Sequence, residues 1–320
     1  MKILVVFGII GLFFNLSYAQ PPNETKNSEK QKQQGKVRTV TIPISIFSKQ
    51  ELKDRQPDEF IQAGDITVKE ADDEQVILSI RSVSNTPLTL AFLIQEDLTT
   101  SFNLELKNLG QFIRRLPKGS RVMVAYLRAG TIQVQQKFTE DLEKAANALR
   151  IVSGSSAISA NSPYEGVKDA LERFDALPSG RRAILLISDG LDTSRGLENL
   201  SPSQSVDLEQ AILRAQRKSV AVYSIYYSTS LTENGNSIYS LDGQGSLNKL
   251  AEETGGRAYF QGTGSPVSFD PFYKDLDLAL NRQFALTYLS THTKKGYYKI
   301  QVLSSNPDIK IGHPKGYYYR

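Results

Sequence analysis

The spacing of apolar residues divides the chain into three regimes. Between Val37 and Ser84, apolar residues recur at every second position, which is typical of half-buried β-strands. From residue 87 to residue 282, nearly continuous apolar runs such as Leu88–Ile94 and Ala183–Ile187 alternate with segments of helical spacing. After Gln283 the two-residue alternation returns and predicts about three more strands. The alternation of strands and helices in the middle regime favours a mostly parallel sheet covered on both faces.

Helices are predicted where apolar side chains recur every three or four residues, over 102–113, 142–149, 163–174, 208–215, 247–254 and 272–279. The start at Pro163 is the clearest, because Ser162-Pro163-Tyr164-Glu165 has the form of a capping box with proline at the first helical position. Further strands are predicted over 122–127, 132–138, 220–227, 257–261 and 310–319.

The β-rich segments at the two ends of the chain hold about three strands each, too few for a core of their own. We therefore expect residues 37–86 and 283–320 to pair, with an α/β domain of residues 87–282 inserted between them. The expected fold class is α/β, a doubly wound, mostly parallel sheet inserted in a smaller β-sandwich-like domain formed by the N- and C-terminal strands.

The first 19 residues have the form of a secretory signal peptide. Lys2 precedes an apolar stretch from Ile3 to Leu16, and Ser17-Tyr18-Ala19 is a small-x-small cleavage motif. The stretch has 14 residues, whereas a membrane-spanning helix needs about 20. We expect cleavage near Ala19, export to the periplasm, the cell surface or the medium, and no transmembrane segment in the mature chain. Residues 20–36 lack large apolar side chains and are predicted to be a disordered tether.

The composition excludes several kinds of chemistry. A chain with no Cys cannot form disulfides, thiol nucleophiles or thiolate metal sites, and its two histidines, His292 and His313, leave little room for multi-His sites. The net charge of +4 is mild and opposite charges are interspersed, so nucleic acid is not an expected partner. A metal site in this chain must therefore be built from oxygen.

Oxygen ligands are concentrated on loops at the expected edge of the sheet. Residues Gln95–Ser101 follow the first strand of the α/β domain, Asn161 and Ser162 precede a helix, and Asp189–Asp192 follow the central strand. In an open parallel sheet, ligands lie beyond the carboxyl ends of the strands. Carboxylates and hydroxyls gathered there suit Mg²⁺ or Mn²⁺. The alternative is that these residues only cap helices and close turns, as Ser162 would in its capping box.

Several segments, taken in order, resemble a von Willebrand factor A domain. They are the Asp/Thr/Ser loop after the first strand, the Ser162 loop, and the stretches 184–190, 215–217, 222–226 and 253–256. Together with 162–164 and 266–269, they are similar to the exported bacterial, acidobacterial-type branch of that family. The resemblance extends over roughly residues 37–320 and depends on order and spacing rather than on one motif.

The resemblance implies adhesion and protein–protein contact rather than catalysis. Many members of the family bind a divalent cation at a metal-ion-dependent adhesion site, with the pattern D-x-S-x-S and a Thr and an Asp on later loops. The implied ligands of Mg²⁺ or Mn²⁺ here are Asp97, Thr99, Ser101, Ser162 and Asp189. Counted from the end of the strand, however, the first aspartate falls on Gln95, which gives the degenerate triplet Gln95-x-Asp97-x-Thr99.

Three functions stay open at this point. The first is an exported, non-enzymatic binding module whose loops 95–101, 153–165 and 189–204 contact a protein ligand that offers a carboxylate to the cation. The second is an exported metal-dependent hydrolase that uses the same carboxylates, with Glu96 or Asp192 as base. The third is a scaffold whose metal site is vestigial. We expect the first.

Overall fold

A computed structural model describes residues 37–48, 65–83, 86–154, 161–178, 180–198, 200–233 and 237–319. The chain divides into two compact units, residues 1–36 and 37–320, and the second is described below. The predicted signal peptide and tether lie outside the described residues. Within the described ranges, no helix combines the length and apolar character needed to cross a membrane.

Six strands form the sheet of the α/β part: β4 (Leu88–Gln95), β5 (Arg121–Arg128), β6 (Thr131–Thr139), β7 (Arg181–Ser188), β8 (Ala221–Tyr226) and β9 (Ala258–Tyr259). Their order is β6-β5-β4-β7-β8-β9, and only the β5–β6 pair is antiparallel. Every residue of β4 is buried, as its continuous apolar run predicts. The chain leaves β4 toward β5 on one side and later returns to β7 on the other. The adjacent carboxyl ends of β4 and β7 are therefore a topological switch point, where ligands bind in such sheets.

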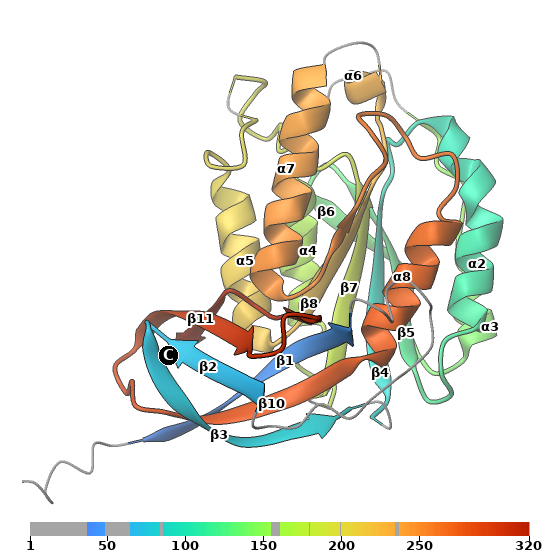
Figure 1. Ribbon diagram of the computed structural model, residues 1–320. Helices are drawn as coiled ribbons and strands as arrows, with labels where there is room; N and C mark the ends of the chain where they lie inside the picture. The colour runs from blue at the N-terminus through green and yellow to red at the C-terminus, as the bar shows by residue number, and fades with distance from the viewer. Residues whose placement is uncertain are drawn as a thin grey trace, which may run out of the picture. The chain divides into compact units, whose positions relative to one another are not determined.

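Helices cover both faces of this sheet (Figure 1). Successive residues of β4 point to opposite faces of the sheet. Phe92 belongs to the core of one face, with α2 (Leu106–Arg114), α3 (Leu142–Asn147) and α8 (Asp270–Asn281). Leu93 belongs to the core of the opposite face, with α4 (Pro163–Glu172), α5 (Val206–Lys218) and α7 (Ser237–Thr254). A 3₁₀-helix, η2 (Thr100–Glu105), precedes α2, and the short α6 (Ser230–Glu233) precedes α7. The expected doubly wound, mostly parallel α/β class is confirmed.

The strands of the two chain ends form a second, antiparallel sheet: β1 (Arg38–Ser48), β2 (Ile66–Glu70), β3 (Asp73–Ser82), β10 (Gln283–Ser290), β11 (Gly296–Ser304), β12 (Ile309–Gly312) and β13 (Gly316–Tyr319). Its order is β12-β1-β10-β3-β2-β11-β13, so N- and C-terminal strands alternate, with Ile42 opposite Leu286. The expected pairing of the two chain ends is confirmed. The strands make one sheet, which curls around a single apolar core and brings β12 against β11.

Two elements differ from their predicted bounds. Helix α7 begins at Ser237, ten residues before the expected start at Leu247, because its first half is held by tertiary contacts rather than by an apolar stripe. The strand predicted over 310–319 is two strands, β12 and β13. It breaks at Pro314, which has no N–H, and the next residue, Lys315, donates its N–H to the carbonyl of Glu253 in α7 (3.2 Å) instead of to a strand.

The two sheets also meet through aromatic and polar contacts. Strand β13 lies beside α5, where the Arg217 guanidinium stands 4.0 Å from the ring centre of Tyr318. Arg257 lies over the Phe47 ring of β1 at 5.4 Å. These contacts join the curled sheet to the lower end of the α/β part, opposite the carboxyl ends of β4 and β7 (Figure 1).

Candidate functional site at the carboxyl ends of β4 and β7

The site begins at Gln95, the last residue of β4. Its side-chain oxygen Oε1 accepts hydrogen bonds from the Ser188 hydroxyl (2.5 Å) and from the Asp189 N–H (3.2 Å). Gln95 is 2% exposed, so its amide forms the floor of the site between β4 and β7. Asp97 lies two residues further on, in the turn after the strand. The register that makes Asp97 the first aspartate of the adhesion pattern needs β4 to continue to Asp97. In the structure β4 ends at Gln95.

Asp189 is the most perturbed carboxyl group of the site. Its Oδ2 accepts a hydrogen bond from the Thr229 hydroxyl (2.7 Å), and its Oδ1 accepts one from the Leu191 N–H (3.1 Å). The pKa of Asp189 is raised to about 6, chiefly by burial and then by the charge of Asp97, against the lowering effect of its hydrogen bonds. Two carboxylates are therefore close enough to repel each other in a buried place, and a cation between them would relieve that repulsion.

Ser162 stands at the start of α4, as predicted, but it does not act as a cap. Its side chain makes no hydrogen bond to the first turn, so the expected capping box is wrong. Glu165, the other half of that box, forms an ion pair with Lys168 (2.6 Å). Ser162 is 2% exposed, and its hydroxyl has no hydrogen-bond partner in the described part of the chain. A buried hydroxyl without a partner is unfavourable by about 1–3 kcal/mol, which calls for a ligand or another function.

Neighbouring hydrogen bonds hold Ser162 beside the loop that follows β7. The Asn161 N–H donates to the Thr193 hydroxyl (3.0 Å), and the Thr193 N–H donates to the Asn161 carbonyl (2.8 Å). On the other side of Ser162, the Tyr164 hydroxyl donates to the Gly190 carbonyl (2.5 Å). The residue Ser162 is therefore held next to the segment that carries Asp189.

Thr99 and Ser101 have other contacts. Their hydroxyls are 3.0 Å apart and share a hydrogen bond, and the Tyr227 hydroxyl donates to Ser101 Oγ at 3.0 Å. The Thr99 N–H donates to the carbonyl of Ser228 (2.9 Å), which ties the loop to the end of β8. The structure thus places Asp97 near enough to Asp189 for their charges to interact, holds Ser162 beside the loop that carries Asp189, and engages Ser101 with Thr99 and Tyr227. The role of Asp97, Thr99, Ser101, Ser162 and Asp189 as metal ligands stays a prediction.

Sequence reasoning missed Thr229, whose hydroxyl donates to Asp189. It also missed that the Gln95 side chain holds the backbone of Asp189. Thr229 follows the end of β8 by three residues, so the rule that directed attention to strand ends could have found it. The contact between Asn161 and Thr193 could not be found in this way, since it joins two loops that are far apart in the sequence.

Two further carboxylates at this edge are already engaged. Glu96 forms ion pairs with Arg150 (2.8 Å) and Arg128 (3.7 Å). Asp192 accepts hydrogen bonds from the hydroxyls of Ser194 and Ser205, both at 2.6 Å. Asp192 therefore organises the loop after β7 and the start of α5, and Glu96 holds two arginines.

The donor set can be tested against a divalent cation. Among the residues that the structure describes, no three His, Asp or Glu side chains gather closely enough to hold a metal ion. The switch point offers the carboxylates of Asp97 and Asp189 and the unpartnered hydroxyl of Ser162. Hard oxygen ligands completed by water suit Mg²⁺ or Mn²⁺, which keep several waters, so these residues fit such an ion.

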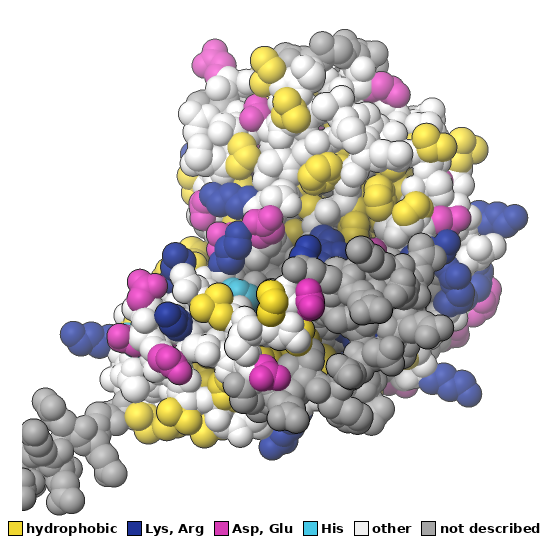
Figure 2. All heavy atoms as spheres, in the orientation of Figure 1, with side chains coloured by type: hydrophobic (Ala, Val, Ile, Leu, Met, Phe, Trp, Pro, Cys, Tyr) yellow, Lys and Arg dark blue, Asp and Glu magenta, His cyan; other side chains and the backbone are white. Residues whose placement is uncertain are grey.

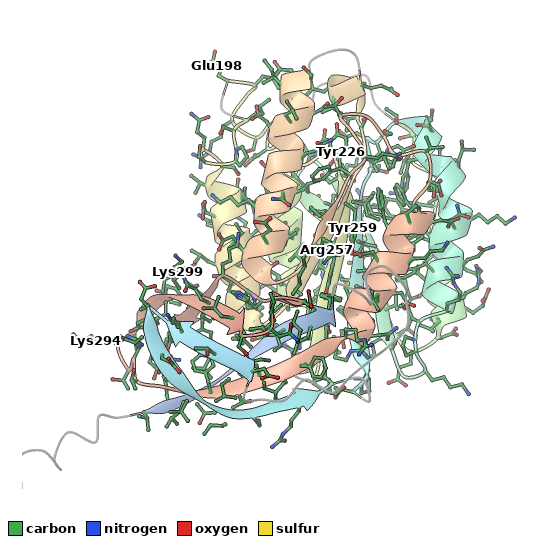
Figure 3. All side chains as sticks on the ribbon, in the orientation of Figure 1. Glu198, Tyr226, Arg257, Tyr259, Lys294 and Lys299 are labelled. Carbon is green, nitrogen blue, oxygen red and sulfur yellow. The ribbon has the colours of Figure 1, made fainter. Side chains whose placement is uncertain are left out.

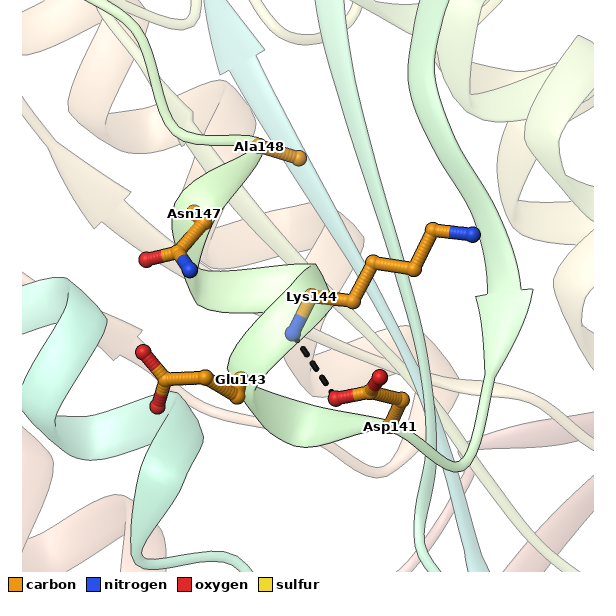
Figure 4. Close-up of a pocket in the computed structure, with 5 residues that line it drawn as sticks. All are labelled: Asp141, Glu143, Lys144, Asn147 and Ala148. Atoms are coloured by element: carbon orange, nitrogen blue, oxygen red, sulfur yellow. Dashed lines mark hydrogen bonds between the residues drawn. The ribbon is translucent and has the colours of Figure 1, made fainter.

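The site lies at the end of the α/β sheet that Tyr226 and Glu198 mark, whereas Lys294 and Lys299 lie at the opposite end, on the curled sheet (Figure 3). An open pocket of about 480 Å³ lies elsewhere, on α3. It is lined by Asp141, Glu143, Lys144, Asn147 and Ala148 (Figure 4). Its main internal contact is the helix cap in which the Lys144 N–H donates to Asp141 (2.9 Å), so it presents no built site.

No family model and no curated protein sequence matches this chain. Among solved structures, it is similar to an aerotolerance-related membrane protein from Bacteroides fragilis (13% identity, 61% of this chain and 98% of that chain, TM-score 0.41). It is also similar to a von Willebrand factor type A protein from Catenulispora acidiphila (11%, 89% and 74%, TM-score 0.39). A third match is proximal thread matrix protein 1 from the mussel byssus, whose metal-ion-dependent adhesion site is occupied by zinc (15%, 68% and 50%, TM-score 0.43). At these identities and TM-scores, the matches indicate no activity or ligand for this chain.

Proposed function

We propose that this chain is an exported, non-enzymatic binding module with a von Willebrand factor A-like domain. In this proposal, it holds a protein partner on the loops at the carboxyl ends of β4 and β7, with a divalent cation held by Asp97, Ser162 and Asp189. The observation that carries the proposal is the Ser162 hydroxyl, which is 2% exposed and has no hydrogen-bond partner among the described residues. A divalent cation bound by the carboxylates of Asp97 and Asp189 would give this hydroxyl a partner.

The electrostatics of the pair support the cation. The raised pKa of Asp189 means that its charged form is unfavourable without a positive neighbour. A divalent cation would favour the charged form of both Asp97 and Asp189 and would give the Ser162 oxygen a partner. Gln95 would hold the Asp189 backbone from below without ligating the ion, because its Oε1 already accepts two hydrogen bonds.

Two contacts favour binding over hydrolysis. Glu96 and Asp192, the expected bases of a hydrolase, are held by two arginines and by two serine hydroxyls respectively. A general base must be within reach of a water and able to accept its proton, which these contacts oppose. Export follows from the signal peptide predicted for residues 1–19.

Calorimetric titration of the purified protein with MgCl₂ and with MnCl₂ tests the cation directly. We expect one binding site, and we expect Asp97→Asn and Ser162→Ala each to weaken it by tenfold or more. Ser203→Ala and Asp270→Asn are matched controls, since both residues are exposed. Absence of binding to the wild-type protein, or equal binding by all four variants, would show that the proposed cation site is wrong.

A further inference from the structure

The two histidines of the chain, His292 and His313, both lie in the curled sheet. His292 follows β10, and His313 belongs to residues 313–315, which join β12 to β13 and which we call the latch segment. Figure 2 shows a histidine side chain where the curled sheet meets the α/β part, with basic and acidic side chains close by. Histidine changes its charge between pH 5 and pH 8, so the contacts of its ring decide whether the surrounding structure responds to acid.

Both ring nitrogens of His313 contact the backbone, and the two contacts need opposite roles. The Val302 N–H donates to Nε2 (3.3 Å), so Nε2 must offer its lone pair. Nδ1 stands 3.0 Å from the Pro314 carbonyl oxygen, which only accepts, so Nδ1 must carry the proton. The arrangement therefore fits the neutral imidazole alone, because a proton on Nε2 would point at the Val302 N–H.

The surroundings of His313 also disfavour a charged ring. Burial lowers the pKa of His313 and the charge of Lys315 lowers it too, against the raising effect of the hydrogen bond to the Pro314 carbonyl. No carboxylate acts on the pKa of the ring. The charged residues on the latch segment and on the elements around it are Lys69 and Glu70 on β2, Lys299 on β11, Lys310 on β12, Lys315 itself, and Glu252 and Glu253 on α7.

The latch segment connects the curled sheet to the α/β part. Lys315 donates its N–H to the Glu253 carbonyl (3.2 Å) and its Nζ to the Glu252 carboxylate (2.6 Å). A Cβ at Gly255, just after α7, would lie 2.9 Å from the Pro314 nitrogen, so the segment lies directly against the end of that helix. Strand β13 follows the segment and packs on α5. The position of β13 therefore depends on the latch segment.

We propose that the latch segment is released by acid: protonation of His313 at Nε2 breaks its bond with Val302, and residues 313–319 then leave α7 and α5. The released ring has the ordinary histidine pKa of about 6.5, whereas the docked ring has a lower one. The docked state is therefore fully favoured above about pH 7 and loses stability as the pH falls below about 6.5. With a docked ring that stays neutral, the released population is about 30-fold larger at pH 5 than at pH 8.

His292 provides an internal comparison, because its ring suits the charged form. Its Nδ1 stands 3.4 Å from a carboxylate oxygen of Glu70, and its Nε2 stands 3.3 Å from one of Asp73. Protonation of His292 would place a donor opposite each acceptor, so acid should not open that end of the sheet. His292→Gln is therefore the matched control for His313→Gln.

Long-range ¹H–¹⁵N NMR spectra of the ¹⁵N-labelled full chain at pH 8 test the ring directly, because they distinguish the two neutral tautomers. The ring signals of the two histidines are assigned with His292→Gln. We expect the His313 ring to carry its proton on Nδ1 and to titrate below pH 6.5. A proton on Nε2 of His313 at pH 8 would overturn the inference, and this measurement needs no variant at position 313.

Hydrogen exchange followed by mass spectrometry at pH 8 and pH 5, with labelling times scaled to the intrinsic exchange rates, measures the release. In the wild type and in His292→Gln, we expect the amide protection of residues 313–319 to fall at pH 5 by about tenfold or more, while that of β4 is retained. His313→Gln should keep its protection, because the glutamine oxygen can accept the Val302 N–H and does not titrate. Equal protection of the wild type at both pH values, a loss shared by β4, or an equal loss in His313→Gln would each contradict the acid-released latch.

Discussion

Replacement of Asp189 by asparagine should stabilise the metal-free protein above pH 6. In the folded protein the pKa of Asp189 is about 6, against 3.8 for an unperturbed aspartate, chiefly because the group is buried. Between pH 4 and pH 6 the folded state therefore binds more protons than the unfolded state, and the free energy of unfolding falls as the pH rises. The shift corresponds to a loss of about 3 kcal/mol, which is nearly complete at about pH 7.

Asparagine keeps most of the local contacts. Its oxygen can still accept the Leu191 N–H, and its amide can donate to the Thr229 hydroxyl, which then acts as acceptor. Because asparagine does not titrate, the free energy of unfolding of the variant does not fall with rising pH on account of this position. We expect its advantage over the wild type to be small at pH 4 and to grow to about 3 kcal/mol at pH 7–8.

Urea unfolding followed by circular dichroism at pH 4, 5, 6, 7 and 8, in EDTA, measures the effect. Taking the difference between the two proteins cancels the contribution of other acids whose pKa is also raised, such as Glu253 and Asp277. Thr229→Val is a second test, since loss of its hydrogen bond should raise the pKa of Asp189 and extend the decline to higher pH. A difference between wild type and Asp189→Asn that stays constant from pH 4 to pH 8 would refute the reasoning.

Three other substitutions test the remaining structure. Ser162→Ala should stabilise the metal-free protein by about 1–2 kcal/mol, measured by urea unfolding in EDTA, because it removes a buried hydroxyl without a partner; destabilisation would mean that the hydroxyl has a partner. Gly243→Ala would place a Cβ 1.9 Å from the Asp189 carbonyl oxygen, so we expect a loss of at least about 2 kcal/mol in thermal unfolding despite the higher helix propensity of alanine. Gly245→Ala in the same helix, whose Cβ would stand 3.0 Å from a proline ring carbon, should cost less. Arg38→Met should destabilise the protein by about 3 kcal/mol in urea unfolding, since it removes the arginine of the ion pair with the fully buried Glu70 and leaves only Ser290 and His292 beside that carboxylate, and the double change with Glu70→Met should recover most of the loss; no recovery would contradict this account.

Most elements of the α/β part could be predicted because their signals are local. The continuous apolar run of 88–94 became β4, and the proline at the start of α4 was predicted to the residue. The early start of α7 could not be predicted, since residues 237–246 lack an apolar stripe and Gly243 is placed by its close approach to Asp189. The capping box failed for a related reason. The sequence contains the right residue types, but Lys168 attracts Glu165, and Ser162 lies in a buried place where its hydroxyl meets no N–H.

The sequence by itself determined the α/β class, the pairing of the two chain ends and the edge of the sheet that carries polar side chains. These properties follow from periodicity and from chain topology, which few alternatives satisfy. Only the tertiary structure decided which oxygens of that edge are engaged. Thr99 and Ser101 bond to each other, and Ser101 also accepts a hydrogen bond from Tyr227, whereas the Ser162 hydroxyl has no partner among the described residues. Whether a hydroxyl has a partner depends on segments that are distant in the sequence and adjacent in space, and no local pattern records that adjacency.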